Sequence, residues 1–392
     1  IVAALAALIF AAQPAHPGSV TWIDGRFDAL ATLMYLGCVT AFVIYMQTRR
    51  RLCYDLALVS LLLAILAKET GLTAPALLLL TDLLFFPQPG VATVPGHRWP
   101  KVHWLAFLRA KLWLHAPFII LGGGYLLLRL WLNAERLIYL GYGGGFRANN
   151  TLMDNGAGYL GMLLGLPSIV GLQGGAALAF VIGFGIVVIA LAVWAGRLAW
   201  FGLAWVFVSM APFANIQVFD QATRYVYLPS VGIALLLAAA LGKGLGSIVG
   251  PGDRANRRAP LRWITAMVAM LIIGYGCLAT VAHNDEWKGA GEMTQRFVEQ
   301  LKAAHPTVAH DSRFFFTGVP FTYKRASVLN AGIIVAVQTT YDDFSLKVYP
   351  AEYNPGVFSA TLQQPSSTPS YYFRFIGSTL KEYPNASALL AP

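Results

Sequence analysis

Apolar residues form long runs that recur from the first residue to about position 282. A transmembrane helix needs roughly 20 consecutive apolar residues to cross the hydrocarbon core of a bilayer. The pattern therefore predicts about nine spans, near 1–12, 28–47, 54–68, 71–87, 113–133, 176–195, 199–216, 225–242 and 262–282. The run at 1–12 is too short for a complete span, so we expect the chain to begin partway through a helix, as a fragment of a longer protein.

The pattern changes near residue 284. Beyond this point charged residues become frequent, with nine acidic and nine basic side chains. Apolar residues at helical spacing predict an amphipathic helix over 286–304, and runs at 314–319, 333–340 and 371–375 predict strands. We therefore expect two domains: an all-α polytopic membrane domain over 1–283 and a small soluble α/β domain over 284–392.

Composition and charge support a membrane protein. Of the 392 residues, 57% are hydrophobic and 12% are charged, whereas about 25% are charged in an ordinary soluble domain. The net charge of +10 would suit nucleic acid in a soluble protein. Here the basic residues gather in alternate loops between the predicted spans, which is typical of membrane topology. We therefore expect a lipid bilayer as a partner, and no nucleic acid.

The loops between the predicted spans differ in charge and so predict an orientation. One set of loops carries 13 basic residues and two acids, Asp55 and Asp253, whereas the opposite set carries six of each sign. Because Lys and Arg are enriched in cytoplasmic loops, we assign the basic set to the cytoplasm. The C-terminal domain then lies on the outer side, which for a bacterial inner membrane is the periplasm.

The segment 134–175 must begin and end outside for this orientation to hold. Its apolar part, 157–172, is short for a span and contains Pro167 and several glycines. We predict that this part is a re-entrant or interfacial helix in the outer leaflet.

Polar clusters occur at the predicted outer ends of spans, where ionisable side chains are costly and are functional candidates if they face a cavity. The clusters are His16, Arg26 and Asp28; Lys68, Glu69 and Thr70; Arg224 and Tyr225 within 220–230; and Arg147 and Asn149 in the long outer loop.

Each cluster also has an ordinary structural explanation. Asp28 begins a predicted helix, where an acidic side chain interacts favourably with the helix dipole, and it could simply pair with Arg26. Lys68 and Glu69 could form a structural ion pair. Tyr225 could be an anchor at the membrane interface. Arg224 is the strongest candidate, because a guanidinium is always charged and its fork of donors suits phosphate.

Three of these segments resemble motifs of GT-C membrane glycosyltransferases, in the order in which that fold carries them. The closest likeness is to bacterial relatives of the transmembrane and tetratricopeptide-repeat O-mannosyltransferases. The pattern H-P-x-H-T-E-A-V-x-W-x-x-G-R-x-D-L-L reads Q-P-A-H-P-G-S-V-T-W-I-D-G-R-F-D-A-L at 13–30; S-K-E-T/Q-G/A reads A-K-E-T-G at 67–71; and E-R-Y-L-Y-L-P-S reads T-R-Y-V-Y-L-P-S at 223–230. Gln13 and Gly18 depart from the pattern, and no tetratricopeptide repeats follow.

The resemblance implies transfer of a sugar, mannose by analogy, from a polyprenyl-phosphate-linked donor to a hydroxyl of a protein or glycan on the outer face. Arg224 and Lys68 would stabilise the charge that develops on the departing phosphate. Family members carry a catalytic acid in a loop after their first span. The corresponding base, which would accept the proton of the acceptor hydroxyl, is expected upstream of Ile1.

The other candidates receive supporting roles from the same resemblance. Asp28, together with Arg26, would bind the sugar or a divalent cation as cofactor. Glu69 would orient Lys68, and His16 and Tyr225 would complete the donor site.

Two other classes of function stay open. A transporter or flippase for lipid-linked sugars would need an internal repeat and discontinuous helices near the midplane. A non-catalytic membrane assembly protein would use the C-terminal domain as a binding module. Polar clusters at the outer ends of the predicted spans favour an enzyme over both.

Overall fold

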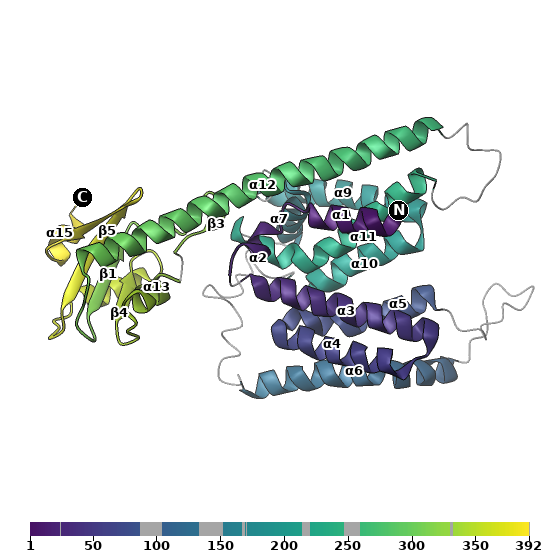
Figure 1. Cartoon of the computed structure of the whole chain (residues 1–392), viewed down its shortest axis with the longest axis horizontal. Coiled ribbons are helices and arrows are strands. Elements are labelled where there is room, and N and C mark those ends of the chain that lie inside the picture. Colours follow the sequence, from purple (N-terminus) through teal and green to yellow (C-terminus); the bar gives the residue numbers. More distant parts are fainter. Residues whose placement is uncertain are drawn as a thin grey trace, which may run out of the picture. The chain divides into compact units, whose positions relative to one another are not determined.

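The computed structural model describes residues 1–23, 25–86, 104–132, 152–166, 169, 171–213, 220–246, 259–329 and 332–391. The chain divides into two compact units, Ile1–Thr280 and Val281–Pro392, close to the boundary expected from composition. Figure 1 shows the helices of the first unit and the sheet of the second. The predicted outer-loop candidates Arg147 and Asn149, and also Pro167, lie outside the described residues.

The first unit is helical throughout its described residues. Its longer helices are α1 (Val2–Ala11), α3 (Arg26–Thr48), α4 (Arg51–Ala67), α5 (Ala74–Phe85), α6 (Trp104–Leu132), α7 (Leu152–Leu164), α9 (Gly174–Ala195), α10 (Arg197–Met210), α11 (Tyr227–Gly244) and α12 (Ala259–Ala304), which continues into the second unit. Short helical segments connect them: α2 (Pro17–Val20), η1 (Glu69–Thr73), η3 (Ala211–Phe213) and η4 (Asp220–Val226).

Five of the described helices are long and apolar enough to cross a bilayer: Arg26–Thr48, Lys111–Leu132, Gly174–Ala195, Thr223–Gly244 and Arg262–Ala304. Many large apolar side chains on them are exposed, among them Ile186 and Val193 of α9. An apolar surface of this extent is not stable in water, and the protein is therefore a helical membrane protein. The other four predicted spans correspond to the shorter helices α1, α4, α5 and α10.

Exposed tryptophans on α6 match the thickness of a bilayer. Trp113 and Trp131 are 73% and 74% exposed. They are 18 positions apart on one helix, which corresponds to about 27 Å at the 1.5 Å rise per residue. This span is close to the roughly 30 Å hydrocarbon core, at whose two surfaces tryptophan is enriched.

Helix α11 is the most buried of the five candidate spans, since 83% of its most apolar stretch lies inside the structure. It packs closely against α10 at a pair of glycines. A Cβ on Gly202 would lie 2.5 Å from the Gly232 carbonyl oxygen, and a Cβ on Gly232 would lie 2.4 Å from that of Gly202. Small residues at such crossings let helix backbones approach in a membrane. This packing fixes the start of α11, which carries the third sequence motif.

A buried charge cluster joins α5 to α6. The carboxylate of Asp82 lies 2.5 Å from Lys111 Nζ and 3.1 Å from His115 Nε2, and all three side chains are at most 7% exposed. The phenyl ring of Phe42 packs against His115 of this cluster and against Phe118. Buried charges of this kind are tolerated only when they are paired, so the cluster ties the two helices together.

The second unit is an α/β domain around a four-stranded sheet of order β4-β1-β5-β6. Its strands are β1 (Arg313–Thr317), β4 (Lys347–Pro350), β5 (Ser370–Ile376) and β6 (Thr379–Tyr383), with a separate hairpin of β2 (Thr322–Tyr323) and β3 (Ala326–Ser327). Strand β1 pairs in parallel with β4 and β5, and β6 is antiparallel to β5. The helices are α13 (Gly332–Tyr341), α14 (Pro355–Leu362) and α15 (Ala386–Leu390).

Side chains alternate across β1 and form a core on each face of the sheet. Phe314 and Phe316 pack with α13 and with the end of α12 through Phe297. Phe315 packs with α14 and α15 on the other face, where it contacts Phe358. The period of two along a strand therefore explains why three consecutive phenylalanines are all fully buried.

One predicted strand is wrong, because residues 333–340 belong to helix α13. The run is rich in β-branched residues and is short, so periodicity alone does not separate a strand from a buried helix. Ile333 and Val337 are both fully buried, and their spacing of four places them on one helix face against the sheet. The predicted helix at 286–304 is correct, and it continues α12 without a break.

We predict that Asp82→Asn destabilises the helical unit by about 3–5 kcal/mol, because the isosteric amide removes the carboxylate that neutralises buried Lys111. The matched control is Asp55→Asn, in an exposed pair with Arg51 whose side chains are 53% and 82% exposed. That change should cost less than about 1 kcal/mol. Apparent melting temperatures in detergent measure both. Equal temperatures for the two variants would contradict the proposed stabilising role of the Asp82 cluster.

Candidate functional site

The three sequence motifs meet at one end of the helical unit. Segment α2 contacts both α3 and η4, and η1 contacts both α3 and α4. The start of α3, the end of α4 and the start of α11 therefore lie together, because these helices run in alternating directions. We call the residues Asp28, Lys68, Arg224 and Tyr225 at this end the cation site, after its two positively charged side chains.

Asp28 and Lys68 form a buried ion pair in the cation site. The Lys68 ammonium donates a hydrogen bond to Asp28 Oδ1, and the two side chains are only 13% and 8% exposed. Asp28 lies in the first turn of α3, where a negative charge also interacts favourably with the helix dipole. Lys68 ends α4 in an extended conformation, with φ −161° and ψ 144°, and this backbone carries its side chain across to α3.

Aromatic rings surround both cations. The Arg224 guanidinium lies 4.8 Å from the centroid of Trp22 and 5.2 Å from that of Tyr225. Lys68 Nζ lies 5.4 Å from the centroid of the same tyrosine and 6.0 Å from that of Phe213. Phe213 and Tyr225 stack with their centroids 4.6 Å apart. All four cation–ring distances are within the range at which a ring attracts a cation, so one tyrosine is shared by two positive charges.

The cation site carries more positive than negative charge. Both Arg224 and Glu69 lie close enough to act electrostatically on the Asp28 carboxylate. Glu69, however, forms its own ion pair with Arg129 at 3.4 Å, near the surface. Among the described side chains, Lys68 pairs with the buried Asp28 carboxylate and Arg224 acts on it electrostatically. The site is suited to bind an anion, and phosphate matches the guanidinium fork.

The structure changes two of the pairings expected from the sequence. Arg26 is exposed, and the ion-pair partner of Asp28 is Lys68 rather than Arg26. Asp28 also takes the role assigned to Glu69, since it is the carboxylate that orients Lys68. Residues two positions apart on a helix, such as Arg26 and Asp28, do not face each other, so neighbours in a motif need not be partners in space.

His16 belongs to the same end of the unit but carries no positive charge. The Ser230 hydroxyl donates its one proton to the Tyr227 carbonyl oxygen at 2.6 Å, so it accepts a hydrogen bond from His16 Nε2 at 3.0 Å. The imidazole lies 4.5 Å and 4.4 Å, between ring centroids, from Phe10 and Tyr227. Burial lowers the pKa of His16 to about 3. His16 is therefore neutral at physiological pH and shapes the site rather than binding phosphate as a cation.

Two departures from the glycosyltransferase motifs touch each other. A Cβ on Gly18 would lie 2.2 Å from Thr223 Oγ1, and both residues are buried. The motifs that these segments resemble have glutamate at both positions, where this chain has a glycine and a threonine. The small pair lets α2 dock directly on η4 beside Arg224.

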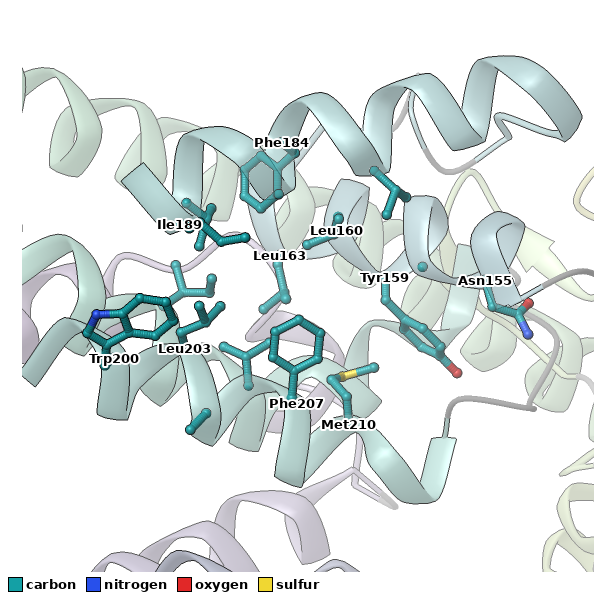
Figure 2. A pocket seen from close by; sticks show the side chains of 17 residues that line it. Asn155, Tyr159, Leu160, Leu163, Phe184, Ile189, Trp200, Leu203, Phe207 and Met210 are labelled. Atoms are coloured by element: carbon teal, nitrogen blue, oxygen red, sulfur yellow. The ribbon is translucent and has the colours of Figure 1, made fainter. Parts of the chain in front are cut away.

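An apolar cavity of about 600 Å³ lies between α7, α9, α10 and α11. Its lining is almost entirely aliphatic and aromatic, with Asn155 and Tyr159 at one end and Trp200 at the other (Figure 2). Cavities that hold small ligands usually measure about 300–1,000 Å³. The described part of the predicted interfacial segment forms the cavity wall, since α7 carries Tyr159 and Leu163.

The cavity is connected to the cation site through Tyr159. Its hydroxyl donates a hydrogen bond to the Phe213 carbonyl oxygen at 3.2 Å, and Tyr159, Phe213 and Tyr225 belong to one buried apolar cluster. Phe213 in turn stacks on Tyr225 and lies beside Lys68. The apolar cavity and the positively charged site are therefore linked by a chain of contacts from Tyr159 through Phe213 to Tyr225.

Metal-ligating side chains do not gather in the described part of the chain: no three His, Cys, Asp or Glu residues there form a group that could hold a metal ion. The Asp28 carboxylate instead has the Lys68 ammonium as its partner.

Sequence reasoning identified the charged members of the site but missed Trp22, Phe213 and Tyr159. Trp22 lies inside the first motif, and this position could have identified it as a candidate site residue. Phe213 and Tyr159 lie outside all three motifs, among apolar residues that periodicity does not separate from ordinary core.

The fold and the site define a helical membrane protein with two cations at one end of its helices and an apolar cavity beside them. No protein-family model, curated protein or solved structure matches the chain.

We predict that Gly18→Ala lowers stability by about 1–3 kcal/mol, the usual range for overpacking, because its Cβ would overlap Thr223 Oγ1. The double variant with Thr223→Ala should recover most of this loss, since the hydroxyl is then gone. Gly183→Ala is the matched control, because a Cβ at Gly183 meets nothing within 4 Å. Melting temperatures of the four proteins test the contact, and a single variant as stable as the wild type would refute it.

We predict a pH-dependent loss of stability that originates at His16. The unfolded imidazole titrates near pH 6.5 and the folded one near 3. Below about pH 6.5 the unfolded chain takes up a proton that the folded chain refuses, so folding stability falls until about pH 3. Between pH 7 and 4.5 the loss is roughly 2–3 kcal/mol.

The His16→Gln variant should lack this component, so its melting temperature should fall less between pH 7 and 4.5 than that of the wild type. His310→Gln is the control, because the His310 side chain is 88% exposed. Identical pH dependence in the wild type and in His16→Gln would show that His16 titrates normally.

Proposed function

We propose that this protein transfers a sugar from a polyprenyl-phosphate donor to an acceptor hydroxyl, as a membrane glycosyltransferase of the GT-C type. The observation that carries the proposal is the paired cations Lys68 and Arg224 beside an apolar cavity. A polyprenyl phosphate has a charged head and a long apolar tail. The two cations suit the head and the cavity suits the tail. The three segments that resemble GT-C motifs meet at the cation site.

The reaction makes specific demands on the cation site. The acceptor oxygen forms a bond to the anomeric carbon while the bond from that carbon to the phosphate oxygen breaks. The phosphate diester carries one negative charge and leaves as a monoester with nearly two. Together with Asp28, Lys68 and Arg224 contribute a net charge of about +1, which neutralises the diester and attracts the growing charge on the leaving group. Such preorganised charge is the largest source of catalysis in many enzymes.

Asp28 has a supporting role in this scheme. Its carboxylate holds the Lys68 ammonium in place, and its free lone pairs can accept hydrogen bonds from the sugar hydroxyls. The proton of the acceptor hydroxyl needs a base, and in this scheme that role is separate from those of Asp28, Lys68 and Arg224. A divalent cation is not required by this scheme.

The proposal includes a location. The cation site and the C-terminal domain would face the outer side of the membrane, the periplasm in a bacterial cell, because the basic loops are assigned to the cytoplasm. The acceptor would be a protein or a glycan, and mannose is the sugar favoured by the resemblance. A lipid-linked-sugar transporter would use the same binding features without forming a glycosidic bond.

The test is transfer of labelled sugar from polyprenyl-phosphate donors by the purified protein, compared with single variants. We predict that Arg224→Lys is reduced about 30- to 1,000-fold in rate, as expected for the loss of roughly 2–4 kcal/mol of charged transition-state contact. Lysine lacks the planar fork that binds phosphate bidentately. It also lacks the flat face that packs on Trp22 and Tyr225. Asp28→Asn should abolish transfer per folded molecule, and it should also lower stability, because it removes the carboxylate that pairs with the buried Lys68 ammonium.

Two variants serve as controls in the same assay. Tyr227→Phe keeps the ring that packs on His16 and should be mildly affected. Arg51→Lys changes an arginine whose side chain is 82% exposed and should be unaffected. Arg224→Lys with more than about half of the wild-type rate would refute the phosphate role. Movement of the donor across vesicles without product would identify a transporter instead.

A further inference from the structure

We infer that Trp22 is a positioning residue that holds the Arg224 guanidinium in the orientation needed to receive a phosphate. This inference rests on the proposed function, and it adds a residue that neither the charge pattern nor the ion pairs reveal.

The first support is the contact itself. The Arg224 guanidinium carbon lies 4.8 Å from the Trp22 ring centroid, the shortest cation–ring distance in the cation site. Tyr225 provides a second ring at 5.2 Å, and Arg224 Nη2 donates to its hydroxyl at 3.4 Å. Arginine side chains lose considerable rotamer freedom when they bind. Two rings that restrict the guanidinium beforehand reduce that loss.

The second support is the way in which Trp22 is placed by the connector, the segment between α1 and α3 that includes α2. A Cβ on Gly25 would lie 2.4 Å from the Gly18 carbonyl oxygen, so the connector folds tightly on itself at this point. Gly18 in turn packs against Thr223, the residue before Arg224. These two close approaches bring Trp22 to Arg224 across about 200 residues of sequence. The position of the Trp22 indole beside Arg224 therefore follows from the backbone packing at Gly18 and Gly25.

The third support is the division of contacts between the rings. Tyr225 contacts both Lys68 and Arg224, at 5.4 and 5.2 Å. A change at Tyr225 would therefore disturb both cations. Among the described cation–ring contacts, that of Trp22 is with Arg224, so a change at Trp22 should disturb Arg224 more directly than Lys68.

A double-mutant cycle tests this dependence. Binding of a polyprenyl phosphate is measured on the whole chain in nanodiscs, for Trp22→Leu and Trp22→Phe, in the wild-type and Arg224→Ala backgrounds. In the wild-type background, Trp22→Leu should weaken binding about tenfold and Trp22→Phe less than about threefold, because phenylalanine keeps a ring. In the Arg224→Ala background, Trp22→Leu should have no further effect. Trp113→Leu, on the exposed face of α6, is the control.

A second measurement does not depend on the ligand. Phenylglyoxal reacts with accessible guanidinium groups, and the labelling rate of Arg224 relative to Arg51 can be followed by mass spectrometry. Trp22→Leu should increase the relative rate at Arg224 several-fold, and Trp22→Phe should largely restore the wild-type rate.

The outcomes separate the two proposals. Unchanged labelling of Arg224 in Trp22→Leu refutes the positioning role, as does an equal loss of binding in both backgrounds. A wild-type protein that does not bind polyprenyl phosphate refutes the proposed function. In that case the labelling result still decides whether Trp22 orders Arg224.

Discussion

The buried ion pair between Asp28 and Lys68 is the interaction on which the arrangement of the site depends. Taking two charges out of water costs several kcal/mol per ion, and only close pairing compensates for that cost. The pair joins the first turn of α3 to the end of α4. The Lys68 ammonium is bound to the Asp28 carboxylate, and the Arg224 guanidinium acts electrostatically on the same carboxylate. The ion pair therefore holds the helix ends together and keeps two cationic side chains in one place.

Aromatic side chains allow two like charges to stay close to each other in this site. Tyr225 faces both cations and stacks on Phe213, whose carbonyl oxygen accepts a hydrogen bond from Tyr159 of the cavity wall. The electron-rich ring faces attract both cations, and the rings exclude water from the pair. This connection makes the charged site and the apolar cavity one structure, which suits a ligand with a phosphate head and a hydrocarbon tail.

The second unit has a core of its own on both faces of its sheet, built largely from aromatic side chains of β1 and β5. Its balanced charge contrasts with the basic loops of the helical unit. Its sheet is ordered by β1, the central strand to which both parallel neighbours pair.

The sequence by itself determined that this is a helical membrane protein with a small α/β domain, because the length and apolar character of a helix decide whether it can cross a bilayer. It also identified Asp28, Lys68 and Arg224, since charges next to apolar runs are costly and conspicuous.

Only the tertiary structure decided which charges pair. Arg26 is exposed and Glu69 binds Arg129, because side-chain direction depends on the local helix geometry. The placement of Trp22 depends on glycine contacts between distant segments, and the assignment of 333–340 to a helix depends on packing against the sheet. Hydrophobic patterns are local properties, whereas pairing and cavity formation depend on residues that are far apart in the chain.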